Sequence, residues 1–250
     1  QIKKIKDAKM KTIVIFVISC FMFIGNNVLA DNSKFSGKYV GISLNYLAAD
    51  HLGTEYGQTA FDWIYDMDIE GYSYGAHIGY RRQINNTPFI KNFLLGIELG
   101  IQNNVADREM FGKDPNSSSS NAALALYKNY VDIQESVSLT PTITYVYKEK
   151  LALTALGGVQ ITKVEDTHWF ANAPGGTGGW KDNINWRQGY VLGGGIEFFV
   201  YKNISTTLKY TYADFGTDRQ GMAVFWGSDG TGLDRSYIEE KIGIGFNYNF

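Results

Sequence analysis

The chain has 250 residues, of which 44% are hydrophobic, 15% aromatic and 19% charged, and its formal net charge is −2. This composition is too apolar and aromatic for a disordered protein, and its lysines and arginines form no basic surface for a phosphate backbone, so we exclude nucleic acid as a partner. A single cysteine excludes an intrachain disulfide and a zinc site built on cysteines.

The first 30 residues have the order of a secretory signal peptide. Five lysines precede an uncharged apolar run at 12–24, and a stretch with small residues ends at Ala30, just before Asp31. The run has 13 residues, whereas a helix needs ~20 to cross a bilayer. We therefore expect residues 1–30 to be an N-terminal extension and a cleavable signal peptide, with translation starting at Met10. Lipidation of Cys20 is the alternative.

Cleavage after Ala30 would change the charge and the stabilising chemistry of the domain at 31–250. It removes five of the 23 Lys and Arg and one of the 25 Asp and Glu, so the net charge becomes −6. No cysteine remains, so disulfides cannot stabilise the domain in an oxidising compartment. A closed, fully hydrogen-bonded set of strands could supply that stability instead.

Residues 31–250 show a hydrophobic period of two, which predicts β-strands whose faces meet different environments. In chain order the alternating segments lie at 37–48, 71–81, 93–102, 131–147, 151–162, 186–200, 203–216 and 236–250. The last is the clearest, because Ile242, Ile244 and Phe246 share one face while Lys241 and Gly243 share the other. Pro141 predicts a bulge or a break in the fourth segment, because proline removes a ladder donor.

The connections between these segments alternate in length. Residues 148–150 join the fourth and fifth segments, about three residues near Tyr201 join the sixth and seventh, and roughly ten join the second and third. The gaps near 49–70, 104–130, 164–185 and 214–235 each span about twenty residues or more. This pattern predicts an all-β fold, an eight-stranded antiparallel transmembrane β-barrel with short periplasmic turns and long extracellular loops.

Aromatic residues gather near both ends of the predicted strands, as expected where rings lie at two headgroup layers. Beside the long gaps they are Tyr46, Tyr72, Trp186, Tyr190, Tyr212 and Tyr237, and at the opposite ends they are Tyr80, Tyr145, Tyr147, Phe198, Tyr201, Tyr248 and Phe250. A soluble sandwich with an aromatic core, the alternative fold, would not produce two bands.

Four stretches resemble the porin-like outer-membrane β-barrel family, which includes small surface antigens of alphaproteobacteria. They are FSGKYVGISLNY, FLLGIELGIQ, LTALGGVQITKV and GYVLGGGIEFFVYKNISTTLKYTYADFG. The resemblance covers nearly all of 31–250 and ends, as such proteins do, in an aromatic residue, Phe250. It implies a barrel among the lipids of the outer membrane of a Gram-negative bacterium, with Phe250 as the assembly signal read by the barrel-assembly machinery.

The predicted interior carries four residues of each charge. By parity the inward residues are Arg81, Arg187, Lys209 and Lys241 against Glu98, Asp132, Glu197 and Glu239. Because an eight-stranded barrel is only wide enough for side chains to fill it, this balance predicts internal pairing rather than a selective pore. Glu197 and Lys209 lie about one diagonal step apart on adjacent strands, and we expect them to pair.

The three histidines offer little catalytic chemistry. His77 is predicted to face the lumen, and neither an HExxH motif nor another paired-histidine spacing exists for zinc. We expect no enzyme, no metal and no cofactor. His168 and Trp169 could offer a ligand and a stacking ring to haemin, although a solvated loop histidine is the simpler interpretation.

We therefore expect a monomeric structural barrel and surface antigen whose extracellular loops recognise a host-surface molecule. A haemin-binding receptor and a small passive porin are the alternatives. An outer-membrane lipid-modifying enzyme comes third, because no His and Ser pair is evident at a rim of the predicted barrel.

Overall fold

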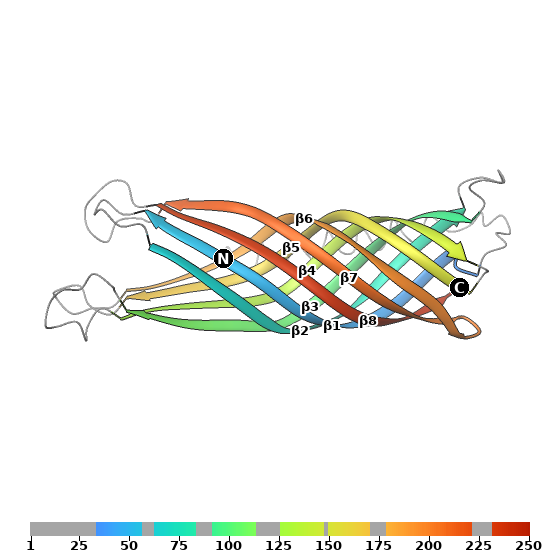
Figure 1. Ribbon diagram of the computed structural model, residues 1–250, viewed down its shortest axis with the longest axis horizontal. Helices are drawn as coiled ribbons and strands as arrows, with labels where there is room; N and C mark the ends of the chain where they lie inside the picture. The colour runs from blue at the N-terminus through green and yellow to red at the C-terminus, as the bar shows by residue number, and fades with distance from the viewer. Residues whose placement is uncertain are drawn as a thin grey trace, which may run out of the picture. The chain divides into compact units, whose positions relative to one another are not determined.

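The computed structural model describes residues 34–56, 63–83, 92–113, 126–147, 150–170, 179–221 and 232–250. Its elements are β1 (Gly37–Tyr56), β2 (Trp63–Gln83), β3 (Phe93–Lys113), β4 (Leu126–Tyr147), β5 (Leu151–Phe170), β6 (Gly179–Tyr201), β7 (Ile204–Gly221) and β8 (Gly232–Asn249). Each strand pairs antiparallel with its neighbours, and β8 pairs with β1, so the sheet closes (Figure 1). The predicted eight-stranded barrel is confirmed. The expected signal peptide at 1–30 lies outside the described residues.

The strands are much longer than a bilayer requires. They run from 18 to 23 residues, against the ~9–11 of a membrane-crossing strand. β1 continues to Tyr56 and β2 begins at Trp63, inside the gap that we predicted to be a loop at 49–70, and the other three long gaps are shortened in the same way. The prediction of loops throughout these gaps is therefore wrong, because the ladder continues well beyond the alternating segments.

Near the end with the short connections, the outward side chains are apolar and exposed. Ile42 is 62% exposed, Leu192 53% and Ile143 52%, and comparable residues from the other strands continue this belt around the barrel. A soluble monomer rarely exposes so large an apolar surface. Hydrocarbon chains solvate it without cost, so the belt marks the part of the barrel that lies in the bilayer.

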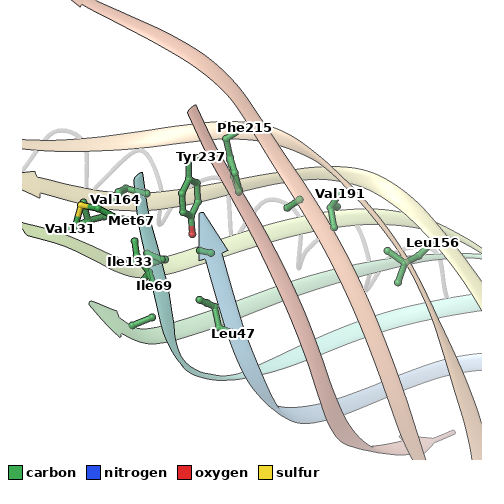
Figure 2. Packing of buried hydrophobic residues seen from close by; sticks show 13 residues of the cluster. Leu47, Met67, Ile69, Val131, Ile133, Leu156, Val164, Val191, Phe215 and Tyr237 are labelled. Carbon is green, nitrogen blue, oxygen red and sulfur yellow. The ribbon is translucent and has the colours of Figure 1, made fainter. Parts of the chain in front are cut away.

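Towards the opposite end, the polarity of the two faces is exchanged. The outward residues of β1 and β2 become acidic and exposed at Asp50, Asp66, Asp68 and Glu70. The inward residues become apolar and buried, and we call them the outer cluster: Leu47, Ala49, Met67, Ile69, Ala106, Val131, Ile133, Leu156, Val164, Val191, Ala213, Phe215 and Tyr237. Every strand contributes to it, and Figure 2 shows Leu47, Ile69, Ile133 and Tyr237 pointing into the barrel. The interior becomes apolar where the surroundings become water.

Two residues of the outer cluster contradict the predicted faces. The aromatic pattern predicts Tyr237 at the membrane edge, but its side chain is fully buried and packs on Phe215 with 5.0 Å between the ring centroids. Parity predicts that Asp132 faces the interior and its neighbour Ile133 the lipid, but Ile133 is buried inside and Asp132 takes the other face. A bulge between Ile133 and Ser136 shifts the register of β4 by one residue, which exchanges its faces.

Pro141 does not break its strand. β4 continues through it, and the pairs Leu139 with Val159 and Thr142 with Leu156 keep one register with β5 on either side. The expected irregularity at Pro141 is therefore wrong, and the bulge lies several residues earlier. The proline lies opposite Ile97 of β3 and occupies an exposed position on the lipid face.

A second, smaller apolar group lies at the end with the short connections. This inner cluster consists of Phe35, Leu94, Val146 and Ala152, with Phe199 packed against it. Between the outer and inner clusters, the inward side chains are polar or charged. Along its axis the interior therefore passes from the inner cluster through a polar zone to the outer cluster, which also surrounds a few buried charged side chains.

The exchange of faces predicts unequal effects at neighbouring positions. Replacing fully buried Ile69 with alanine should lower the free energy of unfolding by about 2 to 5 kcal/mol, because it leaves a cavity in a packed apolar cluster. Replacing the exposed Glu70 with alanine should change it by less than about 0.5 kcal/mol. Urea unfolding in lipid vesicles measures both, and a smaller loss for Ile69→Ala than for Glu70→Ala would contradict the assignment of faces.

Candidate functional site

The polar zone of the interior is organised around two ion pairs. Arg81 on β2 pairs with Glu197 on β6 at 2.7 Å, and both side chains are almost fully buried. The guanidinium also lies over the ring of Tyr39, 4.1 Å from its centroid. Asn247 and Ser205 donate hydrogen bonds of 2.8 Å and 2.5 Å to Glu197, so this carboxylate has partners from three other strands.

The second pair joins Glu98 on β3 to Lys209 on β7 at 2.6 Å. The hydroxyl of Tyr39 donates to the other oxygen of Glu98 at 2.9 Å. Because the same Tyr39 ring lies beneath the guanidinium of Arg81, Tyr39 links the two pairs into one network. Such a network stabilises buried charges only when its members are well paired.

The expected pair between Glu197 and Lys209 does not form. Their positions are as the sequence predicts, since Glu197 lies opposite Thr207 and Lys209 opposite Gly195, one diagonal step away. Each side chain instead reaches across the lumen, to Arg81 and to Glu98 respectively. The lumen of an eight-stranded barrel is narrow enough for opposite walls to touch, and this contact replaces the local cross-strand pair.

A third group of polar side chains lies nearer the outer cluster. Glu239 forms an ion pair with Lys241, accepts a hydrogen bond from Gln160 at 2.8 Å, and accepts another from Tyr237 at 3.0 Å. Lys241 also donates to Gln102 at 2.7 Å. Both oxygens of Glu239 are thus used, and Tyr237 connects the polar zone to the apolar cluster.

A buried charged group inside the outer end was missed by the sequence reasoning. One oxygen of Asp166 lies 2.6 Å from Arg235 and 3.4 Å from His51, and all three side chains are almost completely buried. Arg187, expected in the lumen network, lies here and donates to the backbone carbonyl of Arg235 at 3.5 Å. The gap lengths predict loops at His51, Asp166 and Arg235, but all three lie in strands. Extending the strand alternation into the long gaps would have turned all three inward.

The polar zone encloses a small cavity. The space that the centre of a water molecule can occupy is about 60 Å³, enough for a few waters. Arg81, Thr142 and Glu197 line it towards the inner cluster, and Leu156 and Val191 of the outer cluster bound it at the other end. The buried Thr142 hydroxyl has no hydrogen-bond partner among the described residues, which fits a wet cavity.

The histidines show no arrangement for metal binding in the part of the chain that the structure describes. Among those residues there is no group of three His, Cys, Asp or Glu side chains that could hold a metal ion. His77 is hydrogen-bonded to Asn247 at 2.7 Å. His168 and Trp169 belong to β5, opposite Lys181 and Trp180, but their side chains lie outside the described residues, so haemin contact there stays a prediction. Within the same limits, no helix could span a membrane.

Comparison with known proteins gives sequence relatives from two Brucella species and several similar solved structures. No protein-family model matches the chain. The 31 kDa outer-membrane immunogenic protein of Brucella melitensis is 22% identical over 231 residues, which cover 88% of this chain and 85% of that protein. The structure of Neisserial surface protein A is 12% identical, with a TM-score of 0.44 and coverage of 86% of this chain and 98% of that one. The outer-membrane protease OmpT of Escherichia coli is 11% identical, with a TM-score of 0.48 and coverage of 90% and 99%.

These findings confirm the outer-membrane assignment. The chain closes into an eight-stranded barrel, it carries an exposed apolar belt, and its sequence aligns over most of its length with a protein named for the outer membrane. The protein is an outer-membrane β-barrel of a Gram-negative bacterium.

The cross-lumen pairing predicts which double variants interact. Arg81→Met or Glu197→Gln alone should each lower the free energy of unfolding by about 3 to 5 kcal/mol, because the remaining partner is left buried and uncompensated. Combining them should recover part of that loss, with a coupling energy of about 0.5 to 3 kcal/mol. Urea unfolding in lipid vesicles measures the cycle.

The matched control is a second double-variant cycle, which combines Glu197→Gln with Lys209→Met. These residues are close in the sheet but each pairs elsewhere, so their coupling energy should be smaller than that of Arg81 with Glu197. A coupling energy in the control cycle larger than that of Arg81 with Glu197 would contradict the cross-lumen pairing and support the local pair between Glu197 and Lys209.

Proposed function

We propose that this protein is a closed structural barrel of the outer membrane that displays its extracellular wall and loops as a surface antigen or adhesion surface, without conducting ions. The filled interior is the observation that carries this proposal. Ion pairs cross the lumen from β2 to β6 and from β3 to β7, and apolar clusters lie on both sides of them.

Each layer of the interior opposes permeation. The outer cluster draws buried apolar side chains from all eight strands, and the ionisable side chains Asp166, Arg235 and His51 at this level are buried against one another. Such a constriction opposes the passage of water and hydrated ions. The paired charges of the polar zone leave only the small cavity described above. A passive porin would need a continuous wet path, which these side chains occupy.

The proposed display surface is the part of the ladder beyond the apolar belt. β1 continues about ten residues past Tyr46, a length of roughly 30 Å along a fully extended strand. Its outward positions and those of β2 and β8 carry the exposed acidic residues Asp50, Asp66, Asp68, Glu70 and Glu240, which suit water rather than lipid. The Brucella relative is named an immunogenic protein, and that name supports an antigenic role for this wall.

Single-channel recording in planar bilayers tests the closed barrel. The folded protein should give no steady ion conductance above that of protein-free membranes. The matched measurement uses Ile69→Asp, which places a charge in the outer cluster and should admit water there. Steady conductance from the unaltered protein would favour the passive porin and reject the closed barrel.

We also propose that the C-terminal end of β8 guides assembly of the barrel. Phe250 is 73% exposed on the lipid-facing side of the barrel, and its backbone N–H donates to the carbonyl of Lys38 at 3.0 Å, beside the β1–β8 closure. An exposed aromatic ring at the end of the closing strand is available to assembly machinery before the seam forms.

Replacing Phe250 with aspartate should lower the amount of barrel inserted into the outer membrane, because the ring presented to the assembly machinery is lost. Deleting residues 116–121, in the connection between β3 and β4, is the matched control and should lower it far less. Quantifying the protein in isolated outer membranes measures both. Equal losses from the two changes would count against a role for Phe250 in assembly.

A further inference from the structure

The inner cluster is built differently from the outer one. Its strand residues come only from β3, β4, β5 and β6, namely Leu94, Val146, Ala152 and Phe199. The remaining member, Phe35, belongs to no strand and precedes β1. On the other side of the barrel, β7, β8 and β2 present the polar residues Ser205, Asn249 and Arg81 at this level. At this mouth of the barrel, β3 to β6 thus supply apolar side chains on one side only, and Phe35 completes the apolar layer.

The segment that carries Phe35 is folded back into the barrel by a specific turn. Gly37 has a φ of 109°, a conformation that side-chain-bearing residues rarely adopt, and a Cβ there would lie 3.3 Å from the carbonyl oxygen of Phe250. The hydroxyl of Ser36 donates to the carbonyl of Arg81 at 3.3 Å. Phe35 is consequently 1% exposed, and its ring centroid lies 4.6 Å from that of Phe199.

Ladder neighbours connect the turn that carries Phe35 to the inner end of the polar cavity. Gly37 is opposite Arg81 in the ladder, Arg81 is opposite Gly96, and Gly96 is opposite Thr142. Arg81 and Thr142 both line the cavity. Glu197, the partner of Arg81, lies two residues from Phe199 on the same face of β6. The first polar layer above the inner cluster is therefore the Arg81–Glu197 pair.

We propose that residues 34–36 form a stopper, with Phe35 as its head, that closes the periplasmic mouth of the barrel and keeps periplasmic water from the polar cavity. The short connections mark this mouth as periplasmic. Release of the stopper opens the cavity from this side alone, because the outer cluster is made of strand residues held in the ladder. The stopper rests on the proposed closed barrel and adds that its two closures differ: one is part of the wall, and the other is a movable segment.

Thiol labelling tests the stopper in the full chain. Cys20 is the only native cysteine, so Cys20→Ser gives a thiol-free background, and Thr142→Cys places a reporter in the cavity where no hydrogen bond of the described residues is lost. A small cationic methanethiosulfonate is added to the folded barrel in detergent. Phe35→Ala should raise the labelling rate of this reporter by at least roughly tenfold, because access no longer requires the mouth to open.

Two further variants separate the stopper from general loosening. Phe198→Ala removes the same ring from the lipid face beside Phe199 and should leave the labelling rate unchanged. Gly37→Ala keeps Phe35 but strains the turn that seats it, and should raise the rate as Phe35→Ala does. A second reporter, Ala49→Cys in the outer cluster, should stay slow in every variant.

The labelling rates of the variants decide whether Phe35 closes the mouth. An increase with both Phe35→Ala and Gly37→Ala, but not with Phe198→Ala, supports the stopper. Equal labelling rates in all variants would overturn it, and so would a reporter that is already labelled fast in the unaltered background. Loss of the β-sheet circular dichroism signal in both Phe35→Ala and Gly37→Ala would also overturn it, because pairing of the strands should not need a removable segment. Planar-bilayer recording of the unaltered protein tests the closed barrel separately, so a silent channel with unchanged labelling rejects the stopper alone.

Discussion

The narrowness of a barrel closed with eight strands determines how its interior is arranged. In so narrow a lumen, side chains from opposite walls meet, and every buried charge must find its partner within that space. Glu98 and Glu197 accordingly take cations from strands on other sides of the barrel rather than from the next strand. Tyr39 then connects the two pairs through its hydroxyl and its ring. Glycines beside these residues, such as Gly79 against the Tyr39 ring, leave room for the long side chains.

Two surroundings impose opposite demands on the same strands. In the bilayer the outer face must be apolar, and the polar residues of the alternation are left to pair inside. Beyond the bilayer the outer face meets water, so the interior can hold an ordinary apolar core, here the outer cluster. The change takes place along β1 between Tyr46 and Asp50, where the alternation continues but the chemistry of each face is reversed. The same eight strands therefore form a lipid-facing barrel at one end and, at the other, a water-facing barrel with an apolar core.

The sequence predicted the half of the barrel in which lipid faces one side. There the alternation of Ile242, Ile244 and Phe246 with polar or small residues is strong, and strand number and closure followed from it. The other half was assigned to loops because its apolar residues face inward and its acidic residues outward, so the signal of a lipid face ends there. The cluster of His51, Asp166 and Arg235 was lost for that reason. Ile133 was misplaced because a bulge carries no sequence signature that parity can detect, and the partner of Glu197 depends on the width of the lumen rather than on spacing along the chain.

The long ladder also determines what kind of molecular surface an immune system would encounter. On the part of the barrel beyond the apolar belt, Asp50 of β1 lies opposite Asp68 of β2, and Ala48 of β1 lies opposite Glu240 of β8. Neighbouring side chains therefore come from different strands, and at the β1–β8 seam they come from the two ends of the barrel sequence. An antibody footprint on this wall would join residues that no short peptide contains and would disappear when the barrel unfolds. Epitopes on the proposed display surface would therefore be conformational, and antibodies raised against short linear peptides would not reproduce them.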